Sequence, residues 1–227
     1  MRCVLALVLC GLSAASSYGQ ITTQHFPTYE EALNHVASGL EFTARADTEK
    51  MEVTAADPPA HAETPFDLWT NGVPHAFRVV YNAGSTTGIS IDDRFAVISP
   101  VNVDPATNGL LLTAFTQMDG RQVRLDNLKL TLPGFQVYDV NDFALAAPPD
   151  YLLITTDLPL AGSFILSGQV TFGWPGDLPP PAEQWFEASP VVVPEPSAAA
   201  LLILGGLATT CGRRSERGPH GDARSSR

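Results

Sequence analysis

Histidine is the side chain whose spacing most often reveals a metal centre or a general base, and this sequence spreads its histidines over separate segments. The four that precede the C-terminal region are His25, His35, His61 and His75. No two of them stand at the HxH or HExxH spacing that brings two imidazoles to one face of a strand or helix. We interpret them as ordinary surface or loop histidines and expect neither a metal site nor a cofactor.

Paired carboxylates are the second class of groups that could do chemistry. Asp92 and Asp93 are adjacent, and neighbours on a strand point to opposite faces, so the two cannot flank one glycosidic bond together. Asp139 and Asp142 in "YDVND", and the loop "DPATNG" at 104–109, carry the oxygen ligands that calcium prefers. Neither segment has the ligand spacing of an EF-hand, so we interpret both as solvated loops.

Motifs for nucleophilic or nucleotide chemistry do not occur. The sequence has no GxSxG nucleophile elbow, no P-loop and no GxGxxG, and "GSTTG" at 84–88 reads as a loop between strands. We therefore predict a protein without catalytic activity of its own.

The tryptophans leave a binding function open. Exposed flat rings on a sheet are how carbohydrate-binding modules hold sugars, whereas buried rings anchor a core. We expect Trp69, which opens the strand-rich region, to be buried. For Trp174 and Trp185, which flank a proline-rich segment, both interpretations stand.

Cysteine usage and charge narrow the class of protein further. Cys3, Cys10 and Cys211 lie near the two ends, so the stretch from Gln20 to Glu195 has no thiol for a disulfide or a zinc site. That stretch carries 7 basic and 22 acidic residues, a formal charge of −15, against −11 for the full chain. Such a charge disfavours nucleic acid and anionic membrane surfaces as partners.

Short runs rich in Val, Ile, Leu, Phe and Thr, separated by turn residues, follow Trp69 and predict strands. In "RQVRLDNLKLTL" apolar and polar residues alternate, and the phase slips by one residue at Asp126-Asn127, which fits a β-bulge. "QMDGRQ" predicts a hairpin turn with Gly120 at positive φ. The predicted strands are "HAFRVVYN", "GISI", "FAVIS", "GLLLTAFTQ", "RQVRLDNLKLTL", "YLLITT" and "GSFILSGQVTFGW".

These elements predict a mostly β protein, an antiparallel β-sandwich or jelly roll over residues 65–175, because no second helix interrupts the strands. One short helix is expected in "PTYEEALNHVASG", where Thr28 and Glu31 form a capping box. We expect this helix and a proline-containing linker at 57–65 to make up residues 20–64. The prolines of 176–192 predict an extended stalk.

Both ends of the chain read as targeting segments. Arg2 followed by the apolar run Val4–Leu12 predicts a secretory signal peptide over 1–19, with cleavage before Gln20. Near the other end, residues 197–212 are apolar or small and precede Arg213 and Arg214. A helix there would be a short membrane anchor with its basic end in the cytoplasm. We expect the tail at 218–227 to be disordered.

The stretch "VPEPSAAALLILGGLATTCGRR" resembles the PEP-CTERM sorting signal of bacterial exported proteins, a label also given to the C-terminal domain of ice-binding proteins. The resemblance covers residues 193–217: a VPEPS core, a membrane helix and a basic stop. It implies that Pro194, Glu195 and Pro196 are read by an exosortase, a membrane-embedded processing protease, and that Arg213 and Arg214 end a transient anchor. The "LWTNGVPHAFRVVYN" region is similar to β-sandwich domains found upstream of such signals.

Taken together, the sequence predicts an exported bacterial protein of the envelope or extracellular matrix, with a structural or adhesive role. Its expected partners are the secretion machinery and the exosortase-type protease. The first alternative is a carbohydrate-binding module for exopolysaccharide, which predicts exposed, coplanar tryptophans beside a groove. The second is an extracellular hydrolase, which predicts convergent carboxylates or a nucleophile beside a histidine in a pocket.

Overall fold

The computed structural model describes residues 20–39, 41–99, 101–117, 120–134, 136–145, 149–176 and 184–194. The chain forms one compact unit that ends at Val193, and a second unit begins at Pro194. The predicted signal peptide, the apolar C-terminal run and the tail at 218–227 lie outside the described residues.

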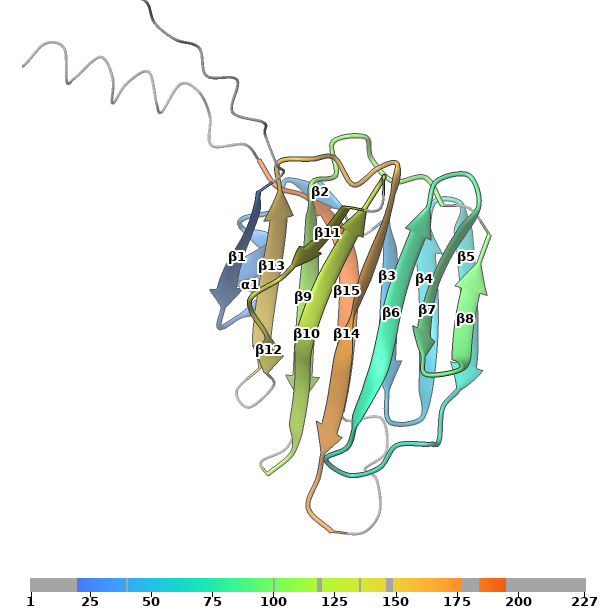
Figure 1. Ribbon diagram of the computed structural model, residues 1–227, viewed down its shortest axis with the longest axis vertical. Helices are drawn as coiled ribbons and strands as arrows, with labels where there is room; N and C mark the ends of the chain where they lie inside the picture. The colour runs from blue at the N-terminus through green and yellow to red at the C-terminus, as the bar shows by residue number, and fades with distance from the viewer. Residues whose placement is uncertain are drawn as a thin grey trace, which may run out of the picture. The chain divides into compact units, whose positions relative to one another are not determined.

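The compact unit is mostly β, as the sequence predicts, and its strands pair antiparallel in two sheets (Figure 1). The elements are β1 (Ile21–Phe26), α1 (Tyr29–Leu33), β2 (Ser38–Gly39), β3 (Phe42–Asp47), β4 (Lys50–Ala56), β5 (Pro59–Pro65), β6 (Pro74–Asn82), β7 (Thr86–Ile91), β8 (Arg94–Ile98), β9 (Gly109–Thr116), β10 (Gln122–Leu132), β11 (Gln136–Asp139), β12 (Ala144–Leu145), β13 (Asp150–Thr156), β14 (Ser163–Gly173) and β15 (Gln184–Val192). The eight-stranded sheet has the order β1-β13-β9-β15-β3-β4-β5, with β2 on β15. The seven-stranded sheet has the order β11-β10-β14-β6-β7-β8, with β12 on β10. All seven runs that the sequence predicts as strands are strands.

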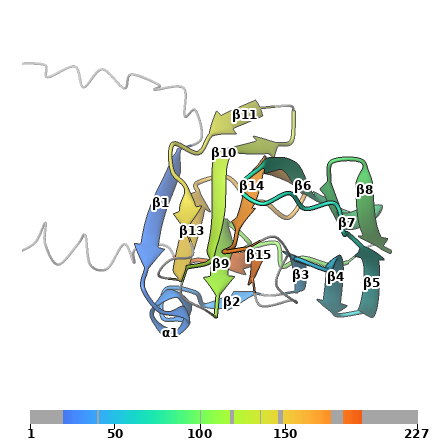
Figure 2. The same ribbon diagram turned by 90° about the horizontal axis from the view of Figure 1, so that it is seen from below.

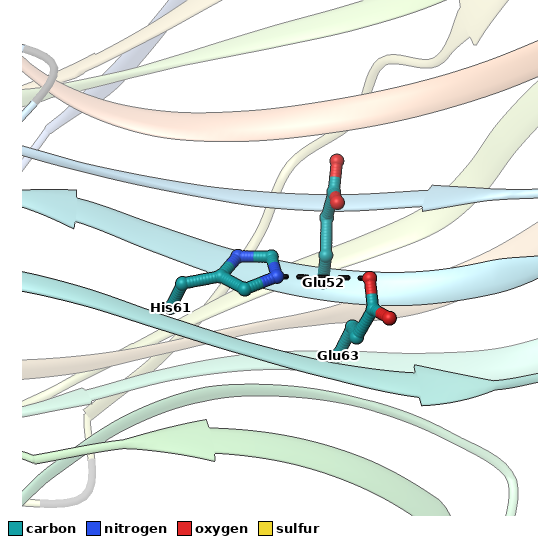
Figure 3. A group of neighbouring side chains, drawn as sticks. All are labelled: Glu52, His61 and Glu63. Atoms are coloured by element: carbon teal, nitrogen blue, oxygen red, sulfur yellow. Dashed lines mark ion pairs between the residues drawn. The ribbon is translucent and has the colours of Figure 1, made fainter.

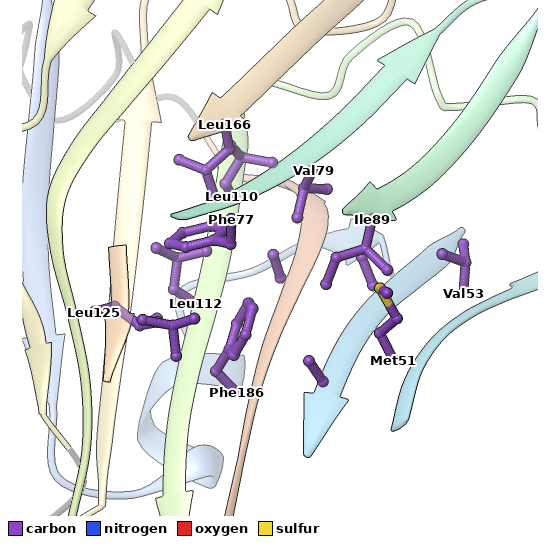
Figure 4. Packing of buried hydrophobic residues seen from close by; sticks show 14 of the residues in the cluster. Met51, Val53, Phe77, Val79, Ile89, Leu110, Leu112, Leu125, Leu166 and Phe186 are labelled. Carbon is purple, nitrogen blue, oxygen red and sulfur yellow. The ribbon is translucent and has the colours of Figure 1, made fainter. Parts of the chain in front are cut away.

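The two sheets lie face to face, as the end-on view in Figure 2 shows, and one hydrophobic core fills the space between their inner faces. Figure 4 shows Phe77 and Leu125 of the seven-stranded sheet close to Leu112 and Phe186 of the eight-stranded sheet. All buried apolar side chains of the described unit fall between residues 21 and 193. The unit therefore contains its own core and can be studied as a domain.

The irregularity predicted at Asp126-Asn127 is confirmed. Asn127 has φ +53°, and the register between β10 and β14 shifts between Asp126 and Lys129. This bulge returns Leu128 to the buried side of β10. A Cβ atom on the facing Gly168 would lie 2.9 Å from the Asp126 carbonyl oxygen, so the bulge requires glycine there.

One of the two hydrogen bonds of the predicted capping box is present: the Thr28 hydroxyl accepts a hydrogen bond from the Glu31 amide at 3.2 Å. The helix ends at Leu33, earlier than expected, and Ser38–Gly39 then pair with β15. Ala32 of α1 is fully buried in a second hydrophobic cluster on the outer face of the eight-stranded sheet. No helix within the described ranges is long and apolar enough to cross a membrane.

The linker predicted at 57–65 is wrong, because residues 59–65 form β5 and pair with β4 along its whole length. Prolines begin and end this strand, and β5 is the outermost strand of its sheet. An outermost strand tolerates prolines because its outer N–H groups have no partner to lose. The expectation that residues 20–64 are only a helix and a linker is wrong for the same reason, because β1, β2, β3 and β4 also lie there and pair within the eight-stranded sheet. The domain consequently includes residues 20–64 as well as 65–175.

The stalk predicted at 176–192 is also wrong over its second half, since β15 lies in the middle of the eight-stranded sheet between β9 and β3. Pro190 is accommodated where the pairing of β15 with β3 has ended at Ala188 and its pairing with β2 begins at Val191. Residues 177–183 lie outside the described ranges. The domain thus extends to Val193.

The hairpin predicted at "QMDGRQ" is wrong in its pairing, although Gly120 does have φ +79°. β9 pairs with β13 and β15, whereas β10 pairs with β11, β12 and β14. The connection therefore crosses from one sheet to the other. Alternation along the two strands is the same in both arrangements, so the sequence pattern does not distinguish them.

Candidate functional site

The three tryptophans do not form a common surface. Trp69 and Trp174 are buried, with 8% and 7% of their surface exposed. The Trp69 indole donates a hydrogen bond to the Asp47 carbonyl at 3.0 Å, as a core anchor does. Trp185 alone stands on the outer face of the eight-stranded sheet, where it is half-buried.

The ring of Trp185 is enclosed by its neighbours on both sides in the sheet. Phe115 of β9 stacks on it with ring centroids 5.0 Å apart, and the Arg45 guanidinium of β3 lies 4.6 Å from its centroid. Because β15 runs between β9 and β3, the two contacts approach from opposite sides. The coplanar, exposed tryptophans that the carbohydrate-binding alternative predicts are therefore not found among the described residues.

Charged side chains continue this outer face toward β5. Arg45, Glu52 and Glu63 occupy paired positions on β3, β4 and β5, and His61 lies two residues from Glu63 on the same strand. Figure 3 shows the His61 ring and the Glu63 carboxylate turned toward each other, with Glu52 beside them. Their ligating atoms all lie within 4.8 Å of each other, which is the arrangement a divalent cation would need.

Lys50 already supplies a cation to this cluster. Its Nζ lies 2.8 Å from Glu63 Oε2 and 3.0 Å from Glu52 Oε2. The hydrogen bonds from Lys50 hold the pKa of Glu63 below its usual range, and the same contacts raise the pKa of Lys50. A metal ion would have to displace this ammonium, so we interpret the cluster as a surface ion-pair network.

Glu187, between Arg45 of β3 and Thr113 of β9, is a half-buried carboxylate of this face. Burial raises its pKa, and Arg45 and the Ser189 hydroxyl partly offset that rise. It is the kind of group that could act as a general acid. The positions paired with it are Arg45 and Thr113, and the charge of Glu52 adds to the rise of its pKa.

His25 and two aspartates form a tighter arrangement where β1 meets the loop that follows β11. His25 of β1 lies with Nδ1 2.9 Å from Asp150 Oδ1, at the start of β13, and Nε2 2.9 Å from Asp142 Oδ1, after β11. Carboxylate oxygens only accept, so both ring nitrogens donate together only in the imidazolium form. We call this group the His25 bridge; it joins the first strand of the eight-stranded sheet to a loop of the other sheet.

The electrostatics of the bridge agree with its geometry. Partial burial alone would lower the pKa of His25, but the hydrogen bonds to Asp150 and Asp142 outweigh it and the pKa is raised. Desolvation works to raise the pKa of Asp142, and hydrogen bonds from Thr23 and His25 outweigh it, so that pKa is lowered.

We predict that His25→Gln lowers the free energy of unfolding by about 1 kcal/mol in mildly acidic solution, as expected for two partly exposed ion pairs. The contribution of His25 is complete below its ordinary pKa of 6.5 and is lost as pH rises through the raised value. The contribution of Asp142 to stability is complete above its ordinary pKa of 3.8, and it is lost as pH falls through the lowered pKa. Urea unfolding across pH measures the difference from wild type, with His61→Gln as the control. A difference that grows toward alkaline pH would contradict the bridge.

The other carboxylates singled out in the sequence are satisfied separately. Asp92 lies in the β7–β8 turn with φ +49°, and its Oδ2 is 2.7 Å from His75 Nδ1. Asp139 Oδ1 lies 3.7 Å from Lys129 Nζ, while Asp142 Oδ1 lies 2.9 Å from His25 Nε2, so each carboxylate has its own basic partner although both line one surface hollow. Asp104 Oδ1 accepts a hydrogen bond from the Ala106 amide, which is a local turn.

The end of the domain is fixed by Asn108, which lies in the loop at 104–109 that the sequence predicts only as a solvated loop. Its Oδ1 accepts from the Val193 amide at 2.8 Å, and its Nδ2 donates to the Val193 carbonyl at 3.1 Å. Of the predicted sorting residues, Pro194 follows this clamp directly and is exposed. Glu195, Pro196, Arg213 and Arg214 lie outside the described residues.

No family model matches the chain, and no match was found among curated proteins.

Proposed function

We propose that this protein is an exported, non-catalytic module of β-sandwich, jelly-roll type, sorted through a C-terminal PEP-CTERM signal and acting structurally or adhesively in the bacterial envelope or matrix. The observation that carries the proposal is the junction at Val193. The last strand ends at Val192, Asn108 clamps Val193, and the Pro194–Glu195–Pro196 tripeptide follows at once. This junction supports the proposal because the described domain is complete at Val193, directly before the proposed sorting tripeptide.

This junction suits processing by a membrane protease. Cleavage at the tripeptide or after it leaves β15, and with it the core residues Phe186 and Ala188, inside the domain. Cleavage before Pro190 would remove Val191 from the sheet and from the second hydrophobic cluster. The fold therefore favours a product that ends near Pro194 to Ser197.

Intact mass of the protein recovered from the envelope and medium of its own host tests the proposal. We expect a species that begins at Gln20 and ends between Pro194 and Ser197. The triple variant Pro194→Ala, Glu195→Ala, Pro196→Ala is expected to reduce that species at least about tenfold, as loss of a recognition motif does. Replacing Pro179, Pro180 and Pro181 by alanine is the matched control. A species that retains Arg213 and the residues after it in the unaltered protein would overturn the sorting route.

A further inference from the structure

The two sheets expose four outermost strands, and three of them are protected against pairing with another chain. β5 begins and ends with proline and carries Glu63. β8 lies beside β5, where the Thr64 hydroxyl donates to the Phe95 carbonyl at 2.8 Å. β11 is only four residues long and ends in Asp139. Proline, charge, shortness and coverage are the usual means of blocking edge-to-edge association.

β1 has none of these protections. Its sequence, ITTQHF, contains no Pro, Gly, Asp, Glu, Lys or Arg, and residues 22–25 are exposed. It pairs with β13 on one side only. In both Figure 1 and Figure 2, no described strand lies beyond β1 on its other side. In a domain of strongly acidic composition, this is an edge of high β propensity whose ionisable side chain, His25, is already paired with Asp142 and Asp150.

Contacts within the domain also hold β1 in one extended conformation. All six residues of β1 pair in register with β13, and the Gln20 amide donates to Asp157 Oδ1 at 2.8 Å. The His25 bridge fixes the other half of the strand. A partner strand would therefore meet a preformed template, with little ordering left to do.

The pairing pattern shows which backbone groups are free. The Asp157 amide donates to the Gln20 carbonyl, and the Thr156 amide donates to Asn108 on the β9 side. In an antiparallel ladder the groups of alternate residues face alternate sides. The amides and carbonyls of Thr22 and Gln24 thus face β13, whereas those of Ile21, Thr23 and His25 face away from it.

We propose that this free edge pairs antiparallel with β1 of a second copy of the chain, about a two-fold axis at Thr23. Thr23 then opposes Thr23, Thr22 opposes Gln24, and Ile21 opposes His25, so the free amides and carbonyls meet and no two β1 side chains of like charge are opposed. The two eight-stranded sheets become one continuous sheet. The contact is small, and the acidic domains repel each other, so association is weak and strengthens with salt. It does not depend on the sorting signal.

Charge placed on the edge tests the pairing and its register. Sedimentation velocity of the domain at 20–194, over a concentration series at low and high salt, is expected to show a reversible dimer. The double variant Thr22→Lys, Gln24→Lys sets lysines opposite lysines and is expected to weaken the dimer at least about tenfold. Mixing it with Thr22→Glu, Gln24→Glu is expected to restore a heterodimer. Asn82→Lys, Thr86→Lys on the exposed pair of β6 and β7 is the matched control.

Backbone hydrogen exchange locates the contact independently of the variants. The amides of Thr23 and His25 are expected to gain protection with concentration, while those of Thr22 and Gln24 are protected throughout. A monomer at all concentrations, or a dimer that the lysines leave unchanged, would overturn the proposal. Protection of Thr23 and His25 in dilute full-length chain would assign the edge to a terminal segment of the same molecule and would overturn it equally.

Discussion

Replacing Phe186 by alanine is expected to lower the free energy of unfolding of the domain by about 3–5 kcal/mol, the range for truncating a buried aromatic ring. Phe186 is fully buried, and its ring centroid lies 5.0 Å from that of Phe77 on the opposite sheet. No side chain nearby can fill the resulting cavity without leaving its own contacts, because interiors are close-packed. The loss corresponds to a fall of about 10 °C in the thermal midpoint for a domain of this size.

This variant separates two interpretations of residues 184–192. In an extended stalk, Phe186 would contribute nothing to the stability of the domain. Calorimetry of Phe186→Ala measures the effect, and Trp185→Ala, which alters the half-buried outer face of the same strand, is the control with the smaller expected loss. A thermal midpoint unchanged by Phe186→Ala would mean that β15 is not part of the core.

The regular strands after Trp69 could be predicted from sequence, whereas β1, β3 and β4 were not predicted, and β5 and β15 were mistaken for a linker and a stalk. β10 has buried Val123, Leu125 and Leu130 at alternate positions, and even its bulge is visible as a slip in that alternation. β5 and β15 instead contain prolines, which are typical of loops and linkers. A strand tolerates a proline where no neighbouring strand pairs with the missing N–H group, as at Pro190. The strand order of the sheet decides where this occurs, and a local sequence pattern does not reveal it.

The side-chain clusters of the candidate site could not be predicted because their members lie far apart in the sequence. His25 and Asp142 could each be noted, but Asp150 had no signal of its own, since it lies 125 residues from His25 and meets it only because β1 pairs with β13. Asn108 precedes a glycine and so suggests a turn. Its clamp on Val193, 85 residues away, follows from the placement of β15.

Replacing Gln184 by glutamate is expected to destabilise the domain by about 3–5 kcal/mol at neutral pH, the cost of leaving a buried charge without a partner. Gln184 is fully buried, and its Nε2 donates to the Gln122 carbonyl at 2.9 Å and to the Gly173 carbonyl at 2.8 Å. Both carbonyls belong to the seven-stranded sheet, so this amide joins the two sheets. Glutamate has the same shape, but it would place a carboxylate oxygen where Nε2 lies, against the Gln122 and Gly173 carbonyl oxygens, which can only accept hydrogen bonds.

The pH dependence of this variant identifies the cause of the loss. Burial beside two carbonyls must raise the pKa of the new carboxyl above its unfolded value of about 4.3. Its ionised form therefore destabilises the domain at neutral pH, and stability recovers as pH falls through the raised pKa, where one O–H can again donate. Urea unfolding at several pH values measures this recovery. Gln136→Glu on exposed β11, where Oε1 already accepts from the Tyr138 hydroxyl at 2.7 Å, is expected to stay within about 0.5 kcal/mol of wild type. Equal stability of the two variants at neutral pH would mean that Gln184 does not link the sheets.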